Sequence, residues 1–345
     1  MSHVLVARLD SLGDMLICGP AIRAVSAGAD RVTVLAGPAG AAAARLLPGV
    51  DDVVVWDCPW ILADPPPVAP FELEWLVARL AASALDEAVV LTSFHQSALP
   101  TALVLRLAGV ARITAVSEDY PGALLDVRLQ SPPEVPEPER MLAIARGAGA
   151  ALPPGDGGGL AVREGLPEPV GLPPGRFMVV HPGVTAPARS YPAPLWEQVV
   201  ATLTARGWDV LVTGSSGEAE LTAATAAAAR PPGTARDCAG AFDLGQLAGV
   251  LERARVVAVG NTGPAHLAAA VGTPVVSLFS PVVPASRWAP YGVPTVLLGD
   301  QQAACRDSRA LRCPLPGHPC LSSVTPEQVV AAVTRLADRA TKRSA

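Results

Sequence analysis

Lysine is almost absent from this chain. Of its 26 basic residues only Lys342 is a lysine, and acidic residues outnumber basic ones to give a net charge of −5. A protein that binds nucleic acid normally presents a basic face to the phosphates. The charge balance therefore argues against nucleic acid as the main partner.

Long apolar runs are also missing. No uninterrupted run approaches the roughly 20 residues that a membrane-spanning helix needs, although 50% of the residues are hydrophobic. The chain does not open with a basic segment followed by an apolar stretch, the pattern of a secretory signal. We expect a cytoplasmic protein without a spanning helix.

Cysteines are few and irregularly spaced. The 6 cysteines in 345 residues do not form the disulfide framework typical of a small secreted domain. Cys305, Cys313, His318 and Cys320 are separated by seven, four and one residues, spacings that match no common zinc pattern. We expect no metal, with this group of three cysteines and one histidine as the alternative.

Apolar runs of strand length alternate with helical patterns along almost the whole chain. Strands are predicted at residues 3–8, 31–36, 52–56, 87–93 and 111–116, and again at 177–181, 208–213, 237–240, 256–259 and 275–279. Repeated strand–helix units build parallel sheets with right-handed crossovers. The sequence therefore predicts an α/β protein with doubly wound parallel sheets.

The length favours two domains, because a single core seldom grows beyond about 250–300 residues. A stretch rich in proline and glycine at residues 152–175 indicates a linker. We expect an N-terminal domain at 1–160, a linker at 161–175 and a C-terminal domain at 176–324. Thr325-Pro326-Glu327 has the pattern of a helix start. Residues 325–345 are predicted as a helix that packs back on the N-terminal domain.

The first strand is followed by Leu9-Asp10-Ser11-Leu12-Gly13-Asp14, and a helix is predicted from Met15 to about Ala27. The loop has one glycine where a dinucleotide-binding loop has three, and no P-loop lysine follows, which argues against NAD binding and ATP hydrolysis. Asp14 comes at the carboxyl end of a strand, where open α/β sheets bind ligands. The alternative is that Asp14 only stabilises a helix N-terminus. His95 also follows a predicted strand and is a candidate substrate contact or a structural histidine.

Residues 256–279 predict strand, tight turn, helix and strand. Gly263 and Pro264 open the helix, since proline is favoured at a first helical position. The free N–H groups of such a helix suit phosphate or sugar hydroxyls. Asn261, Thr262 and His266 bring polar side chains to the same edge. The alternative is a purely structural turn.

These features together resemble glycosyltransferase family 9, the ADP-heptose:lipopolysaccharide heptosyltransferases and their relatives. The family has a first loop that ends in Gly-Asp, as in Gly13-Asp14, and a second-domain opening similar to Pro182-Gly183…Arg189-Ser190-Tyr191-Pro192. Its motif Asp-Thr-Gly-x-x-His-Leu-Ala corresponds to residues 261–268. The resemblance extends over nearly the whole chain. It implies the GT-B architecture, in which two Rossmann-like doubly wound domains face each other across a cleft.

The resemblance also implies a reaction and a site. A sugar, heptose or related, would pass with inversion from a nucleoside-diphosphate donor such as an ADP-sugar to a glycan or glycoconjugate, with Asp14 as the general base. Gly13 and His95 would bind the acceptor. The donor would be bound by Gly183, Thr185, Arg189, Glu218, Asn261, Thr262, Gly263 and His266. No Asp-x-Asp pair offers oxygen ligands to Mg²⁺, so transfer without metal or cofactor is expected.

Two departures from the family bear on the donor sugar: Asn261 replaces an Asp and Tyr191 replaces a Trp. A nucleotide-sugar 2-epimerase and a non-catalytic nucleotide-sugar-binding protein are the alternatives to a transferase. Residues 1–150 carry 10 basic and 17 acidic side chains, a net charge of −7. We therefore expect a neutral or weakly charged acceptor, met in the cytoplasm or at the inner face of the membrane, and not a heavily phosphorylated one. An arginine cluster of Arg8, Arg106 and Arg112 is the alternative, as a small basic pocket.

Overall fold

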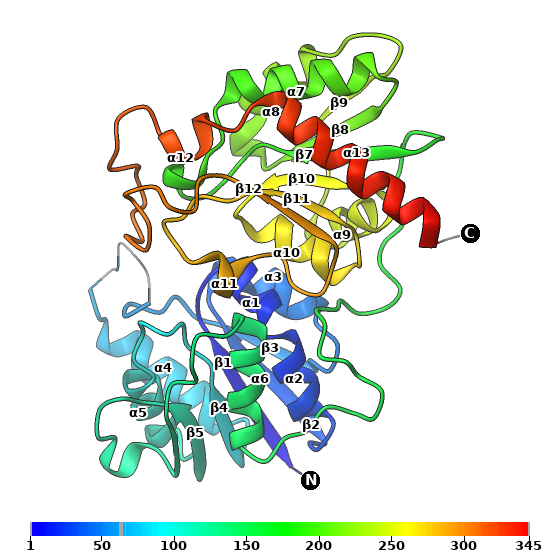
Figure 1. The fold of residues 1–345 in the computed structure, drawn as a ribbon. Helices are drawn as coiled ribbons and strands as arrows, with labels where there is room; N and C mark the ends of the chain where they lie inside the picture. Colours follow the sequence, from blue (N-terminus) through cyan, green and yellow to red (C-terminus); the bar gives the residue numbers. More distant parts are fainter. Residues whose placement is uncertain (1, 62–64, 66, 344–345) are drawn as a thin grey trace. The chain divides into compact units, whose positions relative to one another are not determined.

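The computed structural model describes residues 2–61, 65 and 67–343. The chain divides into two compact units, Met1–Arg163 and Glu164–Ala345. Residues 62–64 and 66, in the proline-rich stretch 58–70, lie outside the described residues. Each unit is an α/β structure built on one parallel sheet, as the alternation of strands and helices predicts (Figure 1).

Unit 1 contains a six-stranded sheet in the order β3-β2-β1-β4-β5-β6. This order, with its reversal between β1 and β4, is typical of Rossmann-like doubly wound folds. The strands are β1 His3–Arg8, β2 Arg31–Ala36, β3 Asp52–Val55, β4 Glu87–Val90, β5 Arg112–Val116 and β6 Val127–Leu129. The helices are α1 Leu12–Ile17, α2 Gly19–Ser26, α3 Pro38–Leu46, α4 Pro70–Ala81, α5 Leu99–Leu107 and α6 Glu137–Gly147, with the 3-10 turn η1 at Gly122–Leu124.

The helix predicted from Met15 to Ala27 is in fact two helices. It begins earlier, at Leu12, and α1 ends at Ile17, while Gly19 and Pro20 start α2. Proline is compatible with a first helical turn but not with the interior of a continuous helix. The break therefore follows from Pro20, and it leaves Asp14 in the first turn of the short helix α1.

Unit 2 repeats the same plan, with the sheet order β12-β11-β10-β7-β8-β9. Its reversal lies between β7 and β10, the first and fourth strands of the unit. The strands are β7 Phe177–His181, β8 Asp209–Gly214, β9 Ala235–Ala239, β10 Val257–Gly260, β11 Val275–Leu278 and β12 Thr295–Leu298. The helices are α7 Ala193–Ala205, α8 Ala219–Ala227, α9 Leu244–Arg253, α10 Gly263–Ala270, α11 Ala285–Trp288, α12 Pro319–Ser322 and α13 Pro326–Arg343, with the 3-10 turns η2 Pro187–Arg189 and η3 Ser216–Glu218.

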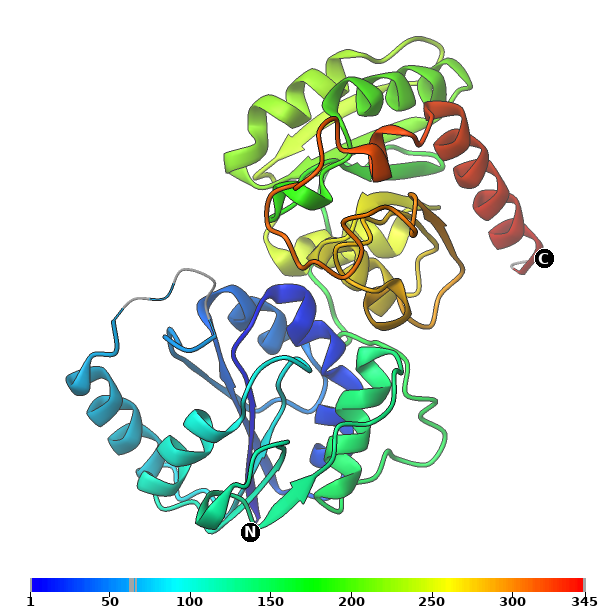
Figure 2. The same cartoon turned by 60° about the vertical axis from the view of Figure 1, so that its left-hand side comes forward.

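The C-terminal helix α13 belongs to unit 2. Its apolar side chains Val329, Val330, Val333 and Leu336 are buried in the core of that unit, and the helix packs on α7. The red helix lies along the second unit in both Figure 1 and Figure 2. The helix at 325–345 was predicted to pack back on the N-terminal domain. Its apolar face instead packs in the core of unit 2. No helix among the described residues is long and apolar enough to cross a membrane.

Both sheets direct polar loops to one edge. Parallel strands end on the same side of a sheet, and ligands of doubly wound folds bind there, at the point where the strand order reverses. In unit 1 that point lies between the ends of β1 and β4, and in unit 2 between the ends of β7 and β10. The predicted site residues follow these four strands and β8, the neighbour of β7, so each unit has its own candidate region.

Candidate active-site residues of the two units

Asp14 is held in the first turn of α1 by its own N-cap. The backbone N–H of Asp14 donates to Ser11 Oγ over 3.4 Å, and the Ser11 hydroxyl donates to Asp14 Oδ2 over 2.7 Å. The carboxylate also favours the positive end of the helix. Its side chain is nevertheless 22% exposed. Asp14 is therefore a fixed carboxylate that is partly open to solvent.

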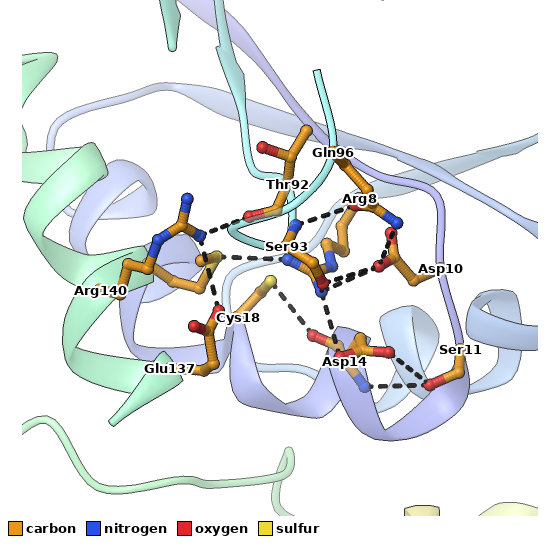
Figure 3. Close-up of polar contacts among 11 residues, drawn as sticks. Arg8, Asp10, Ser11, Asp14, Cys18, Thr92, Ser93, Gln96, Glu137 and Arg140 are labelled. Carbon is orange, nitrogen blue, oxygen red and sulfur yellow. Dashed lines mark hydrogen bonds and ion pairs between the residues drawn. The ribbon is translucent and has the colours of Figure 1, made fainter. Parts of the chain in front are cut away.

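Arg8 forms an ion pair with the other oxygen of Asp14. Its Nη2 lies 3.1 Å from Asp14 Oδ1, 3.1 Å from Asp10 Oδ2 and 2.8 Å from Ser93 Oγ (Figure 3). The side chain of Arg8 is only 1% exposed. Burial by itself lowers the pKa of Arg8, but the charges of Asp10 and Asp14 more than offset this and raise it above its usual value. Arg8 is thus a permanent cation shared by two carboxylates.

Asp10 is the more buried of the two acids, with a side chain 9% exposed. Its Oδ2 accepts hydrogen bonds from Gln96 Nε2 and Ser93 Oγ, both over 3.1 Å, as well as from Arg8. Burial raises the pKa of Asp10, and the negative charge of Asp14 adds to this, while Arg8 and the two hydrogen bonds act in the opposite direction. Ser93 and Gln96 follow β4, so this network joins the loops after β1 and β4.

A second buried pair lies behind this network on α6. Glu137 and Arg140 are each 1% exposed and lie 3.5 Å apart, and Arg140 donates to the backbone carbonyl of Thr92. Figure 3 shows both on α6, with Cys18 between Glu137 and Asp14. The pair ties α6 to the end of the β4 segment. It supports the region that carries Ser93 and Gln96.

The two predicted acceptor residues differ in their surroundings. Gly13 is buried within α1, next to Asp14. His95 is exposed on the loop after β4, between Ser93 and Gln96, and its ring lies edge-on to Phe94 with 5.4 Å between centroids. The structure thus brings both residues to the same edge of the sheet as Asp14.

The predicted alternative of a basic pocket is wrong. Arg8 is buried against Asp10 and Asp14, Arg106 is bonded to Asp126, and Arg112 is paired with Glu87. Each arginine has a carboxylate partner, so the three do not form a patch of free positive charge.

In unit 2, Gly183 and Glu218 lie in direct contact. A Cβ added to Gly183 would fall 1.9 Å from Glu218 Oε1. The other oxygen, Oε2, accepts from the Ser215 backbone N–H over 2.7 Å and from Ser215 Oγ over 2.8 Å, which forms the capping box of η3. The absence of a side chain at Gly183 lets the loop after β7 meet a carboxylate that the loop after β8 holds in place.

The loop after β10 contacts the same region. A Cβ on Gly260 would lie 2.7 Å from Val184 Cγ1 and 3.4 Å from the carbonyl oxygen of Arg189, so the loop from β7 passes close over the end of β10. Asn261 is 4% exposed, and its Nδ2 has no hydrogen-bond partner within the described part of the chain. Thr262 is the N-cap of α10 but makes no side-chain cap bond. Pro264 has no N–H, and the N–H of Ala265 donates to the Thr262 carbonyl over 3.0 Å, so the N–H of Gly263 is the donor that the start of α10 offers a ligand.

The remaining predicted donor residues lie on the same loops and helix. Gly263 starts α10, and His266 is on its first turns, 4% exposed. Arg189 ends η2 with a half-buried side chain, and Thr185 is exposed earlier in that loop. The eight predicted donor residues thus come together at the carboxyl ends of β7, β8 and β10.

His181 ends β7 beside this region and was not predicted as a site residue. It is buried, and its Nδ1 lies 3.0 Å from Thr213 Oγ1. Burial lowers the pKa of His181 to about 4, although the charge of Glu218 acts in the opposite direction. The imidazole is therefore neutral at pH 7 and supports the loop without adding charge.

Tyr191, one of the two departures from the family, lies in the core. It is 1% exposed, donates its hydroxyl to the carbonyl of Val324 over 2.8 Å and packs edge-on against Trp196. It therefore tethers the segment before α13. Its replacement of a Trp bears on core packing, contrary to the expectation that it bears on the donor sugar.

The alternative metal site has no geometric support in the part of the chain that the structure describes, where no group of three or more His, Cys, Asp or Glu side chains is arranged to hold an ion. Cys305 and Cys320 are buried in the core of unit 2, and Cys313 is half-buried. Burial raises the pKa of Cys320 to about 11. The buried Cys305 and Cys320 therefore anchor the 299–323 segment in the core.

Comparisons with known proteins agree with this geometry. Residues 168–317 match the family model described as Glycosyltransferase family 9 (heptosyltransferase). Lipopolysaccharide heptosyltransferase 1 of Pseudomonas aeruginosa is 33% identical over 124 residues, which are 36% of this chain and 34% of that protein. The match thus spans about a third of the relative's length.

Two solved structures resemble nearly the whole chain. The glycosyl transferase family 9 protein from Veillonella parvula DSM 2008 has a TM-score of 0.79 at 16% identity, with 98% of each chain covered. ADP-heptose LPS heptosyltransferase II of E. coli has a TM-score of 0.74 at 20% identity, with 98% of this chain and 99% of that chain covered. At such identities the likeness shows the fold.

The two doubly wound units are therefore those of the GT-B class of fold. The resemblance predicted from the motifs is confirmed: the chain is similar to glycosyltransferase family 9 over residues 168–317 and to a lipopolysaccharide heptosyltransferase over 124 residues.

Proposed function

We propose that this protein is an inverting glycosyltransferase that moves a sugar from a nucleoside-diphosphate donor to a glycan or glycoconjugate acceptor. The observation that carries the proposal is the partly exposed Asp14 carboxylate, fixed on one oxygen by Ser11 and on the other by Arg8. It lies where doubly wound sheets bind ligands. A general base must be both held in position and open to substrate, and Asp14 meets both needs.

In the proposed reaction an acceptor hydroxyl attacks the anomeric carbon of the donor sugar. The new bond forms between the hydroxyl oxygen and that carbon, the bond from the carbon to the diphosphate oxygen breaks, and its electron pair leaves with the nucleoside diphosphate. The proton of the hydroxyl passes to Asp14. Attack from the face opposite the leaving group gives inversion.

Unit 2 would bind the donor. The N–H of Gly263 at the start of α10, with Arg189 and Thr185, suits the negative charge that develops on the leaving diphosphate. Glu218, held against Gly183, is suited to accept hydrogen bonds from a ribose. Asn261 Nδ2 is buried and has no hydrogen-bond partner among the described residues, which suits it to donate to a hydroxyl of the transferred sugar. An ADP-sugar is the donor of choice because the E. coli neighbour is described as an ADP-heptose enzyme.

We further propose that the reaction needs no metal and that the acceptor is neutral or weakly charged. The absence of an Asp-x-Asp pair and the acidic balance of residues 1–150, with 10 basic and 17 acidic side chains, support these two points. Heptose or a related sugar is the class of group transferred.

A two-stage experiment tests the function. Nucleoside diphosphates and nucleotide-sugars are first screened by thermal shift, since a ligand of the folded state raises the melting temperature. The stabilising donor is then incubated with neutral and phosphorylated acceptors, with and without EDTA. Transfer that survives EDTA and prefers neutral acceptors is expected. Epimerised donor without acceptor, or binding without any turnover, would contradict a transferase, and activity restored only by Mg²⁺ or Mn²⁺ would contradict metal independence.

A further inference from the structure

The loop that carries Asp14 holds a second acid. Asp10 Oδ2 and Asp14 Oδ1 each lie 3.1 Å from the same nitrogen, Arg8 Nη2: Asp10 accepts a hydrogen bond from it, and Asp14 forms an ion pair with it. The cation is buried, and Ser93 Oγ also accepts a hydrogen bond from that nitrogen, over 2.8 Å. The cluster of Arg8, Asp10 and Asp14 therefore carries one excess negative charge when all three are ionised.

The sharing of Arg8 by two carboxylates affects how readily Asp14 takes up a proton. A guanidinium that pairs with one carboxylate stabilises its charged form and typically lowers the pKa of an aspartate by about 1–3 units. Such an aspartate is well anchored but takes up a proton poorly. A second carboxylate on the same cation divides the attraction and adds like-charge repulsion, which favours proton uptake.

We propose that Asp10 is a positioning residue for Asp14, which shares the Arg8 guanidinium so that the base is held in place without losing its affinity for a proton. The inference rests on the proposed function, because it assigns a role relative to Asp14 as the base. Asp10 itself is 9% exposed and bonded to Gln96 and Ser93, so it is fixed by protein contacts and is not a substrate contact.

The other charged and titratable groups around the cluster leave this balance in place. On α6, Glu137 and Arg140 form a pair of opposite charges. On α2, Arg23 is bonded to Asp156. Cys18, at the end of α1, is neutral over the working range because burial raises its pKa to about 12. Arg45 on α3 and His95 after β4 are exposed.

The test compares Asp10→Asn with Ser93→Ala. Both remove a partner from the network, but only the first removes a charge. In Asp10→Asn the Arg8 cation acts on Asp14 alone and lowers its pKa further. In the plot of kcat against pH, the fall in rate on the acid side is therefore expected to move to lower pH by about 1 unit. The plateau rate should fall by about 3- to 10-fold because the base is weaker. Ser93→Ala should leave the pH of that acid-side fall in kcat unchanged. A His95→Gln variant shows whether that histidine contributes to the acid-side fall.

A second readout needs no turnover. In protein labelled with carboxyl-¹³C aspartate, the resonance missing from Asp14→Asn identifies Asp14, and its titration is followed in the wild type and in Asp10→Asn. Two coupled carboxylates titrate in two macroscopic steps, so the wild-type Asp14 curve should be biphasic, and the curve of the variant should have one step at lower pH. This wild-type result is informative even where Asp10→Asn fails to fold.

Different results would contradict the two proposals, Asp14 as the general base and Asp10 as its positioning residue. Near-wild-type turnover by Asp14→Asn would overturn the proposed function. An inactive Asp14→Asn together with a single-step Asp14 titration, or with an unchanged Asp14 titration in folded Asp10→Asn, would overturn the role of Asp10 and leave Asp14 as the base.

Discussion

A Cβ on Gly183 would lie 1.9 Å from Glu218 Oε1. That distance is far below any van der Waals contact, and Glu218 cannot retreat freely because Ser215 holds its other oxygen at 2.7 and 2.8 Å. The glycine of the Pro-Gly segment is therefore required by the neighbouring carboxylate. The contact links the loops after β7 and β8 into one surface.

Gly183→Ala is expected to destabilise the protein by about 1–3 kcal/mol, the usual cost of overpacking, and to weaken nucleoside-diphosphate binding. Urea unfolding and calorimetric titration with ADP measure the two effects. Gly175→Ala is the matched control, since nothing lies within 4 Å of its added Cβ. The explanation fails if Glu218→Ala in the Gly183→Ala background restores none of the lost stability.

Tyr191→Phe should lower the free energy of unfolding by about 1–2 kcal/mol, because the Val324 carbonyl loses its hydrogen bond in a buried setting. Donor affinity should not change, since Tyr191 lies in the core of unit 2. Chemical denaturation and donor titration check both points. Tyr120→Phe, at a tyrosine that is 85% exposed, is the control with no expected effect. If Tyr191→Phe weakened donor binding without lowering stability, Tyr191 would have to contact the donor, contrary to this prediction.

His181 should make unfolding depend on pH. Burial lowers the pKa of His181 from 6.5 to about 4 in the folded protein, while the unfolded chain keeps the ordinary value. The unfolded state therefore binds a proton first as pH falls, so stability is lost between about pH 6.5 and 4, by roughly 3 kcal/mol in total. Urea unfolding at several pH values should give a shallower dependence for His181→Asn than for the wild type. Equal slopes in the two proteins would contradict this account.

Arg189→Ala should weaken nucleoside-diphosphate binding by about 1.5–3 kcal/mol, as expected when a hydrogen bond to a charged group is lost. Isothermal titration with ADP measures the change. Arg206→Ala, an exposed arginine at the end of α7, is the matched control and should bind as the wild type does. Similar affinities for wild type and Arg189→Ala would exclude Arg189 from the phosphate site.

The sequence predicts much of this arrangement because local patterns carry it. Apolar runs mark most strands, and a polar loop after a parallel strand must lie at the carboxyl edge of its sheet. Asp14, Arg189 and Asn261 were found on that ground and through the family resemblance. The break between α1 and α2 was missed although Pro20 signals it.

The network around Arg8 could not be predicted because its partners are far apart in the chain. Ser93 is 85 residues from Arg8, and only the pairing of β1 with β4 brings their ends together. The core position of Tyr191 depends in the same way on Val324, 133 residues later. Burial and charge sharing of this kind are properties of tertiary packing, which no local spacing encodes.

The central claim is that Asp14 is the general base, and the most direct measurement is the turnover of Asp14→Asn with the donor identified by thermal shift. The account predicts a folded protein with unchanged donor affinity and a kcat lower by about 10²–10⁴-fold, the effect typical of a lost general base. Asp119→Asn, at an exposed acid of unit 1, should turn over as the wild type does. A correctly folded Asp14→Asn that transfers sugar at nearly the wild-type rate would contradict the account.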